Sequence, residues 1–335
     1  MRIDELDYDL PEGLIAQEPL ADRSASRMLR LDKETGEVRH LIFRNLLDEL
    51  RAGDLLVLNN TRVSALRLMG RKETGGEVEA MLLTEEENGL FSCLLKPGKR
   101  LRAGTRVLFS DGLSGVCQAE SDGPLRKLQL EGRDWRKHLA EQGRTPLPPY
   151  VHTMLQDQER YQTVYSARPG SAAAPTAGLH FTPGILTALA EKGIRTTYVT
   201  LDVSLDTFRP VQSETVEGHT IHGEQCELTE AAAASINGCS GRVVAVGTTS
   251  VRTIESFSQG RRQVSPGQMK TTIYITPGYT FKNVDAILTN FHMPRTTMLA
   301  MLSAFTRKEY LIEAYRQAIV EKYRFLSFGD AMLLA

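Results

Sequence analysis

One histidine stands where its ring could take part in proton transfer. His180 lies in the stretch 174–184, APTAGLHFTPG, between a glycine turn and the predicted start of a helix. Thr182 can cap that helix, and Pro183 suits its first position. Because the N-terminal end of a helix disfavours a nearby cation, it favours a neutral imidazole that can accept a proton. The alternative is a ring that only hydrogen-bonds the loop and holds its shape.

Four further polar segments each follow a short apolar run. The runs are DLLVL, RTTYVTLDV, RVVAV and VDAILT. In open α/β sheets, ligands bind where the loops gather at the carboxyl ends of the strands. The side chains that a plain turn would not require are Asn59, Asn60 and Arg62; Asp202, Asp206 and Arg209; Thr248, Thr249 and Arg252; and Asn290, His292 and Arg295. Four such loops predict one composite pocket.

Two short motifs add to these loops. The segment GTTS at 247–250 can hold a carboxylate or phosphate on its amides and hydroxyls, with Arg252 adding a planar fork, although an ordinary helix cap is the alternative. The segment HTIHGE at 219–224 places two histidines three residues apart, followed by Glu224. Its flanking glycines disfavour a helix and no further ligand pair is evident. Acid–base or hydrogen-bonding roles are therefore favoured over a metal.

The loops must be positioned by an α/β domain, and 335 residues leave room for a second one. Residues 63–150 contain six short alternating runs separated by turn clusters such as KETGG and EEENG. This pattern predicts a small six-stranded β-barrel. Before and after it, short strands lead into loops and helical periods. We therefore expect a discontinuous α/β domain with a mixed sheet, residues 1–62 and 151–335, into which the barrel domain 63–150 is inserted.

The overall composition excludes disorder and gives no global attraction to nucleic acid. Hydrophobic residues make up 41% and charged residues 24% of the chain, and the net charge is −1. The first residues, MRIDELDYDLPEG, have no basic segment followed by an apolar one, and no later run is long enough to span a bilayer, so a cytoplasmic location is expected. The four cysteines are far apart, without a CxxC pair, and are expected to be structural thiols.

The charge is uneven along the chain. Between residues 91 and 110, five basic side chains occur without an acidic one: Lys96, Lys99, Arg100, Arg102 and Arg106. This basic run could contact phosphates. The alternative is a solvated strand-and-turn face.

Taken in order, the motifs resemble one family, the S-adenosylmethionine:tRNA ribosyltransferase-isomerases of queuosine biosynthesis. The resemblance runs from end to end of the chain. It rests on YDLPEGLIAQEP, SRML, LNNTRV, LLKPGKRL, PLPPYV, RYQTVYSARPG, APTAGLHFTP, GTTSVRTIES, TNFHMPRTTM and FLSFGDAML. The chain departs from the family pattern HVGxGTF at 202–208, where Asp202, Ser204 and Asp206 stand for a histidine and two glycines. Met293 and Thr296 replace a leucine and a serine.

The resemblance implies a reaction and its partners. The ribosyl moiety of S-adenosylmethionine would be transferred to the aminomethyl group of 7-aminomethyl-7-deazaguanine at the wobble position of tRNA and isomerised, giving epoxyqueuosine-tRNA, adenine and methionine. The implied tRNAs have GUN anticodons. S-adenosylmethionine is a consumed substrate in this reaction, and no metal or other cofactor is expected. The family's α/β domain with an inserted β-barrel agrees with the pattern described above, and a monomer is favoured.

The implied reaction needs a base and an acid. The sulfonium acidifies the ribose C5′ hydrogens, so that a positioned base can form an ylide-like carbanion that expels adenine. His180 is the first candidate for this base, with His222, His292 and Glu224 as further catalytic candidates. Phe181 is expected to face the sulfonium or a base ring. The expected binding groups are Thr248, Thr249 and Arg252 for the methionine carboxylate, Asn290 and His292 for adenine or ribose, Asp202 or Glu224 for a cation, and the basic run for tRNA phosphates.

Two other classes of function compete with this reading. A non-catalytic RNA-binding protein would explain the basic run, but not the four polar loops. A methyltransferase would explain a pocket for S-adenosylmethionine, but the glycine-rich turn after a first strand is missing.

Overall fold

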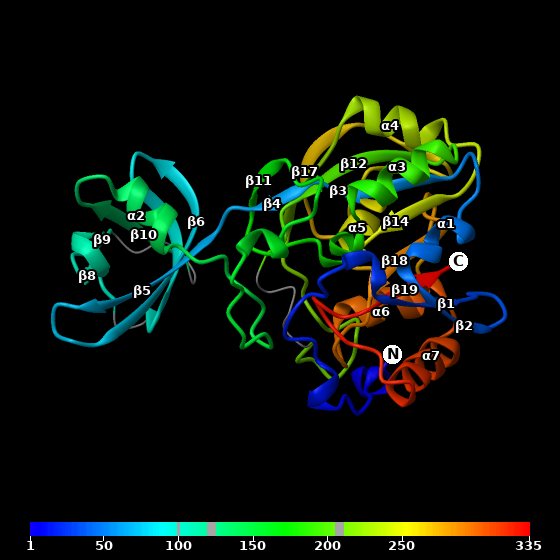
Figure 1. The fold of residues 1–335 in the computed structure, drawn as a ribbon, viewed down its shortest axis with the longest axis horizontal. Coiled ribbons are helices and arrows are strands. Elements are labelled where there is room, and N and C mark those ends of the chain that lie inside the picture. The colour runs from blue at the N-terminus through cyan, green and yellow to red at the C-terminus, as the bar shows by residue number, and fades with distance from the viewer. Residues whose placement is uncertain (99–100, 119–124, 205–210) are drawn as a thin grey trace. The chain divides into compact units, whose positions relative to one another are not determined.

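The computed structural model describes residues 1–98, 101–118, 125–204 and 211–335. The chain divides into two compact units (Figure 1). The α/β unit comprises Met1–Thr61, Pro148–Arg168 and Ala174–Ala335, and the barrel unit comprises Arg62–Leu147 and Pro169–Ala173. A nine-stranded mixed sheet and a closed six-stranded barrel confirm the predicted fold class. Four residues singled out in the sequence, Lys99, Arg100, Asp206 and Arg209, lie outside the described ranges.

The sheet of the α/β unit brings together strands from all parts of the chain. In spatial order its strands are β17 (Gly267–Thr271), β13 (Glu224–Leu228), β12 (Arg195–Leu201), β3 (Leu55–Asn59), β14 (Val243–Val246), β18 (Ala286–Asn290), β19 (Ala331–Leu334), β1 (Arg27–Leu31) and β2 (Val38–Ile42). The four strands β12, β3, β14 and β18 run parallel to one another. Strand β19 is antiparallel to β18 and parallel to β1, and the strands at both edges pair antiparallel. The carboxyl ends of the four parallel strands therefore share one edge.

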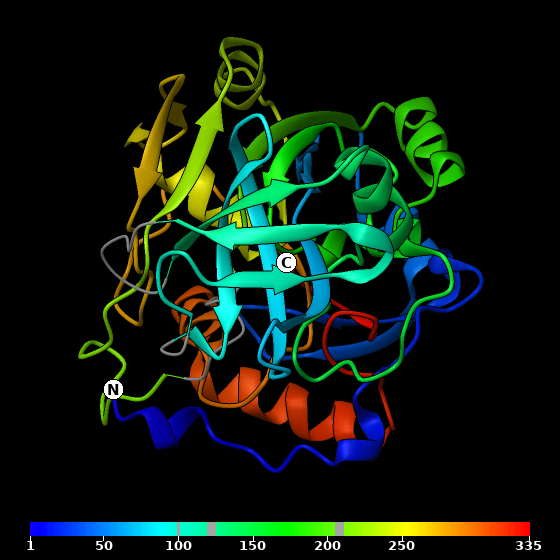
Figure 2. The same ribbon diagram turned by 90° about the vertical axis from the view of Figure 1, so that its left-hand side faces the viewer.

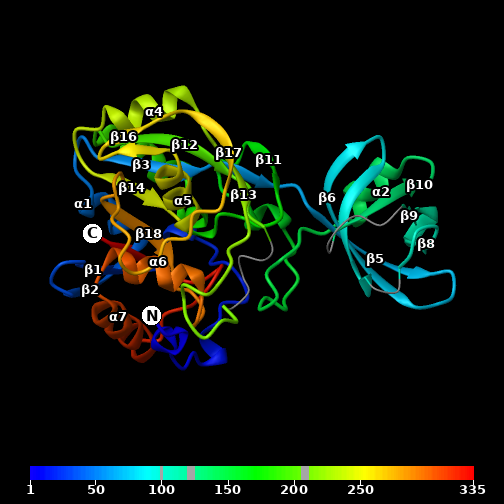
Figure 3. The ribbon, with the colours of Figure 1, turned by 180° about the vertical axis from the view of Figure 1, so that it is seen from behind.

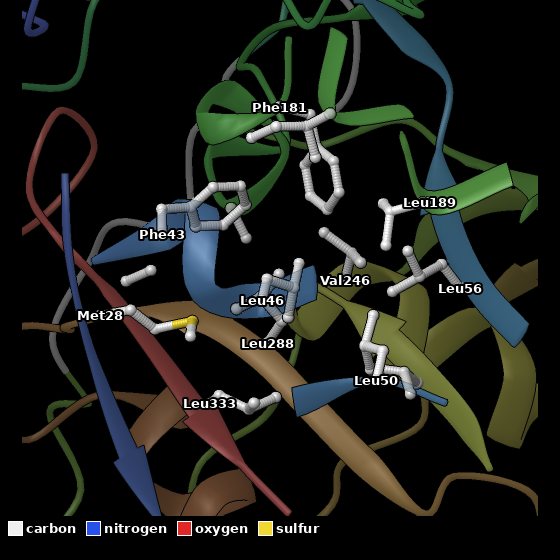
Figure 4. Packing of buried hydrophobic residues seen from close by; sticks show 14 of the residues in the cluster. Met28, Phe43, Leu46, Leu50, Leu56, Phe181, Leu189, Val246, Leu288 and Leu333 are labelled. Atoms are coloured by element: carbon white, nitrogen blue, oxygen red, sulfur yellow. The ribbon is translucent and has the colours of Figure 1, made fainter. Parts of the chain in front are cut away.

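The central strands are buried on both faces. Every residue of β3, β14 and β18 is buried, and their sequences LLVLN, VVAV and AILTN are the continuous apolar runs typical of covered parallel strands. On one face, Leu56, Val246 and Leu288 pack against Phe43 and Leu189 (Figure 4). These two residues come from the segment leading into α1 (Leu46–Glu49) and from α3 (Pro183–Glu191). Helices α5 (Thr248–Ser256) and α7 (Lys308–Val320) also pack on sheet strands, α5 against β12 and β14 and α7 against β1.

Among the described residues of the α/β unit, three helices begin at threonine caps. The Thr182 side chain accepts a hydrogen bond from the Ile185 N–H at 3.2 Å, and Gly193 adopts a φ of 76° just beyond the end of α3, as its sequence predicts. Threonines also cap α4 (Glu230–Asn237) and α6 (Thr297–Phe305), and Figure 3 shows α6 beside α7. A 3-10 helix, Thr176–His180, precedes α3. No helix in the described ranges has the length and apolarity to cross a membrane.

The barrel unit closes six antiparallel strands around its own core (Figure 2). The strands are β5 (Leu66–Lys72), β6 (Glu77–Glu87), β7 (Leu90–Lys96), β8 (Arg106–Leu108), β9 (Ser114–Cys117) and β10 (Arg126–Glu131). Alternating residues such as Val78, Ala80 and Leu82 point inward and are buried. Helix α2 (Trp135–Gln142) follows, with Trp135 and Leu139 packed against this core. Two small two-stranded sheets complete the chain: β4 (Thr61–Val63) with β11 (Arg168–Ser171), and β15 (Ser258–Gly260) with β16 (Gln263–Val264).

Candidate active site

The loops predicted to form a pocket meet at the carboxyl edge of the parallel strands, where Asn59 binds them together. Its amide donates to the Leu201 carbonyl at the end of β12 (2.9 Å) and to Thr249 Oγ1 on α5 (3.2 Å). Its Oδ1 accepts from the N–H groups of Leu201 and Thr61, each at 3.1 Å. Asn59 is fully buried, so its polar atoms are satisfied within the protein. Its role is to fix two strand ends and a helix N-terminus relative to one another.

Two adjoining pockets open at this edge, and Thr248, Thr249 and Met298 line both of them. The larger, here the Arg252 pocket, has a cavity volume of about 200 Å³. The smaller, here the Asn290 pocket, has a volume of about 60 Å³. The Arg252 pocket is also lined by Ser204, His219, His222, Glu224, Tyr274 and Met301, and the Asn290 pocket by Tyr150, Thr176, Val203, Thr289, His292 and Ser327.

A buried ion pair lines the larger pocket. Arg252 Nη1 donates to Glu224 Oε2, and Glu224 Oε1 accepts from the Ser204 N–H at 2.9 Å. The two side chains are only 9% and 2% exposed. Among the described residues, Nε and Nη2 of Arg252 have no acceptor. Because leaving buried charged donors unsatisfied is costly, the Arg252 pocket favours a ligand that brings an anionic or carboxylate oxygen.

The first turn of α5 reaches both pockets. It begins at Thr248 after Gly247, whose φ of 84° is a conformation that side-chain-bearing residues rarely adopt. The N–H groups in the first turn of a helix lack an intrahelical acceptor and attract anions. The GTTS motif is thus both a helix start, with Gly247 at the N-cap and no side-chain cap, and part of the pocket wall.

The HTIHGE segment contributes four residues to the Arg252 pocket: His219, Ile221, His222 and Glu224. His222 is exposed, whereas the partly buried His219 lies edge-on to Tyr274 with ring centroids 5.8 Å apart. Burial and the neighbouring His222 lower the pKa of His219. The carboxylate of Glu224 is engaged by Arg252 and by the backbone. Within the described ranges, no group of three or more His, Cys, Asp or Glu side chains is placed to hold a metal ion.

His292 lines the Asn290 pocket and is held by three hydrogen bonds. Its Nε2 lies 2.8 Å from Thr289 Oγ1, its backbone N–H donates to the Tyr315 hydroxyl at 3.0 Å, and its carbonyl accepts from the Tyr8 hydroxyl. Burial lowers the pKa of His292 to about 3. The ring is therefore neutral near pH 7.

His180 lies behind the Asn290 pocket, in the 3-10 helix before α3. Its side chain is buried and stacks on Phe43, with ring centroids 5.0 Å apart. Nδ1 is 2.8 Å from Ser26 Oγ, and Nε2 is 3.3 Å from Asn290 Nδ2. Burial, together with two nearby guanidinium groups, lowers the pKa of His180 to about 4. The ring is neutral near pH 7, but both nitrogens are engaged by the protein, which is the geometry of the loop-holding alternative.

Two predicted ligand-binding residues have other surroundings. Phe181 is fully buried in the core, edge-to-face with Phe43 at 5.1 Å, so it packs beneath the site instead of facing a sulfonium. Asp202 Oδ1 accepts from Thr61 Oγ1 at 2.7 Å. Burial raises the pKa of Asp202 and the charge of Glu224 raises it further, which outweighs the hydrogen bond from Thr61. The carboxyl group of Asp202 is therefore tied to the first residue of β4.

The basic run lies in the barrel unit, where acidic side chains of other segments approach it. Arg106 is paired with Glu131 at 2.7 Å and lies 3.7 Å from Glu73. Lys96 is 79% exposed and stands 4.0 Å from Glu79, and Arg102 is exposed. The run has no acidic residue in its sequence, but acidic side chains from neighbouring strands and turns pair with it in the folded barrel.

Sequence reasoning missed Ser26, Thr176, Thr289 and Tyr274. Ser26, Thr176 and Thr289 do stand within the quoted motifs SRML, APTAGLHFTP and TNFHMPRTTM. Nothing in their spacing links them, however, because Ser26 is 154 positions from its partner His180. The Tyr274 hydroxyl is buried without a partner among the described residues, a signal that exists only in three dimensions.

Comparison with known proteins gives a consistent result. A family model described as "Queuosine biosynthesis protein" matches residues 3–334. Curated relatives from Macrococcus caseolyticus and Caldanaerobacter subterraneus are 47% and 46% identical over the full length of both chains, and each is named S-adenosylmethionine:tRNA ribosyltransferase-isomerase. A crystal structure of S-adenosylmethionine tRNA ribosyltransferase from Thermotoga maritima is 34% identical with a TM-score of 0.57, covering 99% of this chain and 100% of that one.

We expect the protein to lose stability as the pH falls from about 6.5 to about 4, in part because of His180. Its folded pKa of about 4 lies below the ordinary 6.5, so between these values the unfolded chain binds a proton that the folded chain does not. His180→Gln removes the contribution of this proton to the pH dependence of stability. Urea denaturation should show that the unfolding free energy of the wild type falls by about 2 kcal/mol more than that of the variant between pH 7 and pH 5. Parallel pH profiles of the two proteins would contradict a buried neutral ring.

Proposed function

The chain belongs to the queuosine biosynthesis protein family of S-adenosylmethionine:tRNA ribosyltransferase-isomerases, and on this premise we propose the reaction that it performs. The ribosyl moiety of S-adenosylmethionine is transferred to the aminomethyl group of 7-aminomethyl-7-deazaguanine in tRNA and isomerised, which yields epoxyqueuosine-tRNA, adenine and methionine. The tRNAs carry GUN anticodons. We place the enzyme in the cytoplasm because tRNA is its substrate.

The observation that carries this proposal is the unsatisfied guanidinium in the Arg252 pocket. Its Nε and Nη2 donors, which have no acceptor in the part of the chain that the structure describes, form a fork that matches a carboxylate, and Glu224 already balances one positive charge. A zwitterionic amino-acid end, as in S-adenosylmethionine, brings both a carboxylate and an ammonium group to this pair. The adjoining Asn290 pocket then takes the adenosyl end, so the ribose spans the shared wall of Thr248, Thr249 and Met298.

We assign the general base to His222. It lines the Arg252 pocket, whereas His180 lies behind the Asn290 pocket and lines neither of the two. His292 also lines the site, but a pKa of about 3 makes its ring a weak base. In the proposed sequence the base removes a C5′ hydrogen beside the sulfonium, and the resulting carbanion expels adenine and opens the sugar ring. The tRNA amine then attacks, and the freed oxygen closes the epoxide as methionine leaves.

The barrel unit is proposed to contact the tRNA. Residues 62–147 contain 15 Lys and Arg against 12 Asp and Glu, a net charge of +3, whereas the whole chain has −1, which leaves −4 outside the barrel. A phosphate backbone is attracted to the positive unit. The exposed Lys96 and Arg102 have the geometry for such contacts, while Arg106 would first have to leave Glu131.

Analysis of products tests the function. We expect adenine and methionine to be released together, only when the tRNA carries 7-aminomethyl-7-deazaguanine. A methyltransferase would give S-adenosylhomocysteine instead, and an RNA-binding protein would give no product. Because the proposed steps need no Lewis acid, a chelator should leave the yield unchanged. The matched variants are His222→Ala, which should lose product together with any uptake of deuterium from solvent at C5′, and His180→Gln, which should keep that uptake.

Arg252→Lys should weaken the use of S-adenosylmethionine alone. Lysine keeps a positive charge opposite Glu224 but lacks the forked donors, so the KM for S-adenosylmethionine should rise by about 10- to 100-fold, the effect of one hydrogen bond to a charged group. The KM for tRNA should not change. Arg242→Lys is the matched control, since Arg242 pairs with Asp54 at 2.7 Å at the amino end of β14. A similar rise in both variants would mean that Arg252 only stabilises the fold.

Alanine at Lys99, Arg100 and Arg102 together should raise the KM for tRNA and leave that for S-adenosylmethionine unchanged. Each lost phosphate contact should also flatten the dependence of log affinity on log salt by about 0.7–0.9. Steady-state kinetics over a range of salt concentrations measure both effects. Arg316→Ala, an exposed change on α7 of the α/β unit, serves as the control. An effect confined to S-adenosylmethionine would refute the assignment of the basic run.

A further inference from the structure

A chain of four polar side chains leads from the protein interior to the wall of the Asn290 pocket. Ser26 Oγ lies 2.8 Å from His180 Nδ1, His180 Nε2 lies 3.3 Å from Asn290 Nδ2, and Asn290 Oδ1 lies 2.9 Å from Thr176 Oγ1. Ser26, His180 and Asn290 are 2%, 5% and 3% exposed. Only Asn290 and Thr176 line the pocket; Ser26 and His180 line a separate small cavity of about 20 Å³.

The contacts at the inner end of this chain favour one direction for its hydrogen bonds. When the Ser26 hydroxyl donates its one hydrogen to the Arg23 carbonyl, 3.2 Å away, Ser26 Oγ accepts from the histidine ring. His180 therefore carries its hydrogen on Nδ1. Its Nε2 then has a lone pair and accepts from the amide of Asn290, which turns Oδ1 toward the Thr176 hydroxyl.

The outer end of the chain consequently has a fixed polarity. One Asn290 amide hydrogen is used on His180, and the other remains available to a ligand. Thr176 uses its hydroxyl hydrogen on Asn290, so toward the pocket its oxygen is an acceptor. A ligand therefore meets one donor and one acceptor side by side, and the two cannot exchange places while His180 keeps its tautomer.

We propose that His180 is a positioning residue that sets the orientation of the Asn290 amide, so that the Asn290 pocket selects the amino-bearing edge of adenine. This inference rests on the proposed function, in which the adenosyl end of S-adenosylmethionine occupies this pocket. The adenine amino group donates to Thr176 Oγ1, and the adjacent ring nitrogen accepts from Asn290 Nδ2. Hypoxanthine in the same pose would set its carbonyl oxygen against Thr176 and its N1 hydrogen against the Asn290 amide, so both contacts would be mismatched.

Two substitutions of His180 by residues with amide side chains test the roles of Nδ1 and Nε2 separately. His180→Gln places a carbonyl oxygen near the position of Nε2 and keeps an acceptor for Asn290. His180→Asn supplies a donor near the position of Nδ1 but does not reach Asn290, whose amide is then free to turn over. Calorimetry would compare the binding of S-adenosylhomocysteine and S-inosylhomocysteine to each full-length protein.

Wild type should prefer the adenine compound by about 100-fold or more. The Gln variant should keep this preference to within about 3-fold, while the Asn variant should lose about 10-fold or more of it. A residue with only a packing role would weaken both ligands equally, so an unchanged ratio in His180→Asn would overturn the proposal.

A measurement of the His180 tautomer in the wild-type protein tests the proposal even if a variant fails to fold. Nitrogen-15 NMR of the histidine rings should show His180 protonated at Nδ1 and bare at Nε2, and a hydrogen on Nε2 would overturn the proposal. A different result is expected if the proposed function itself is wrong. In that case wild type would bind neither nucleoside compound and release no adenine, while the tautomer of His180 would be unaffected.

Discussion

A polar side chain buried at the end of a β-strand must find its hydrogen-bond partners within the protein, and the carboxyl edge of this sheet is built around that constraint. Asn59 uses its whole amide to join β3, β12 and α5. Asn290, at the same position on β18, uses only part of its amide on His180 and Thr176. The two asparagines look alike in the sequence. Their difference is that Asn290 borders a cavity, whereas Asn59 lines neither of the two pockets.

The ion pair of Arg252 and Glu224 shows the same constraint for charged groups: a buried charge must also find its partner within the protein. A guanidinium buried alone would be strongly destabilising, and a carboxylate partner offsets that cost without using all the donors of the planar group. The pair thus allows a charged group to be kept beside a pocket whose lining also includes the apolar side chains of Met298 and Met301. Lysine could balance Glu224 as well, but it would offer no second set of fixed donors.

Local patterns predicted most of the fold. The alternation of runs such as GEVEAMLL gives the barrel strands, and Thr182 with Gly193 gives the bounds of α3, because period-2 burial and helix capping depend on neighbours in sequence. For the site, the sequence predicted which loops contribute to it, but not which side chains within them contact one another. The engagement of His180 by Ser26 and the burial of Phe181 in the core depend on contacts between distant segments. The charges facing the basic run were hidden for the same reason, since Glu131 on β10 reaches Arg106 on β8 across the intervening strand β9.

The place of β19 in the sheet has a consequence for the order in which the chain can assemble. Residues 331–334 lie between β18 and β1, so the β1–β2 pair joins the rest of the sheet through a strand about 300 positions later in the sequence. During synthesis, β1 and β2 emerge first and must wait for β19 with an unpaired edge. Such an edge invites pairing with other chains, and closing so distant a contact is slow. The nascent protein therefore passes through a stage in which its first strands need protection from aggregation, by a chaperone or by the neighbouring N-terminal segments.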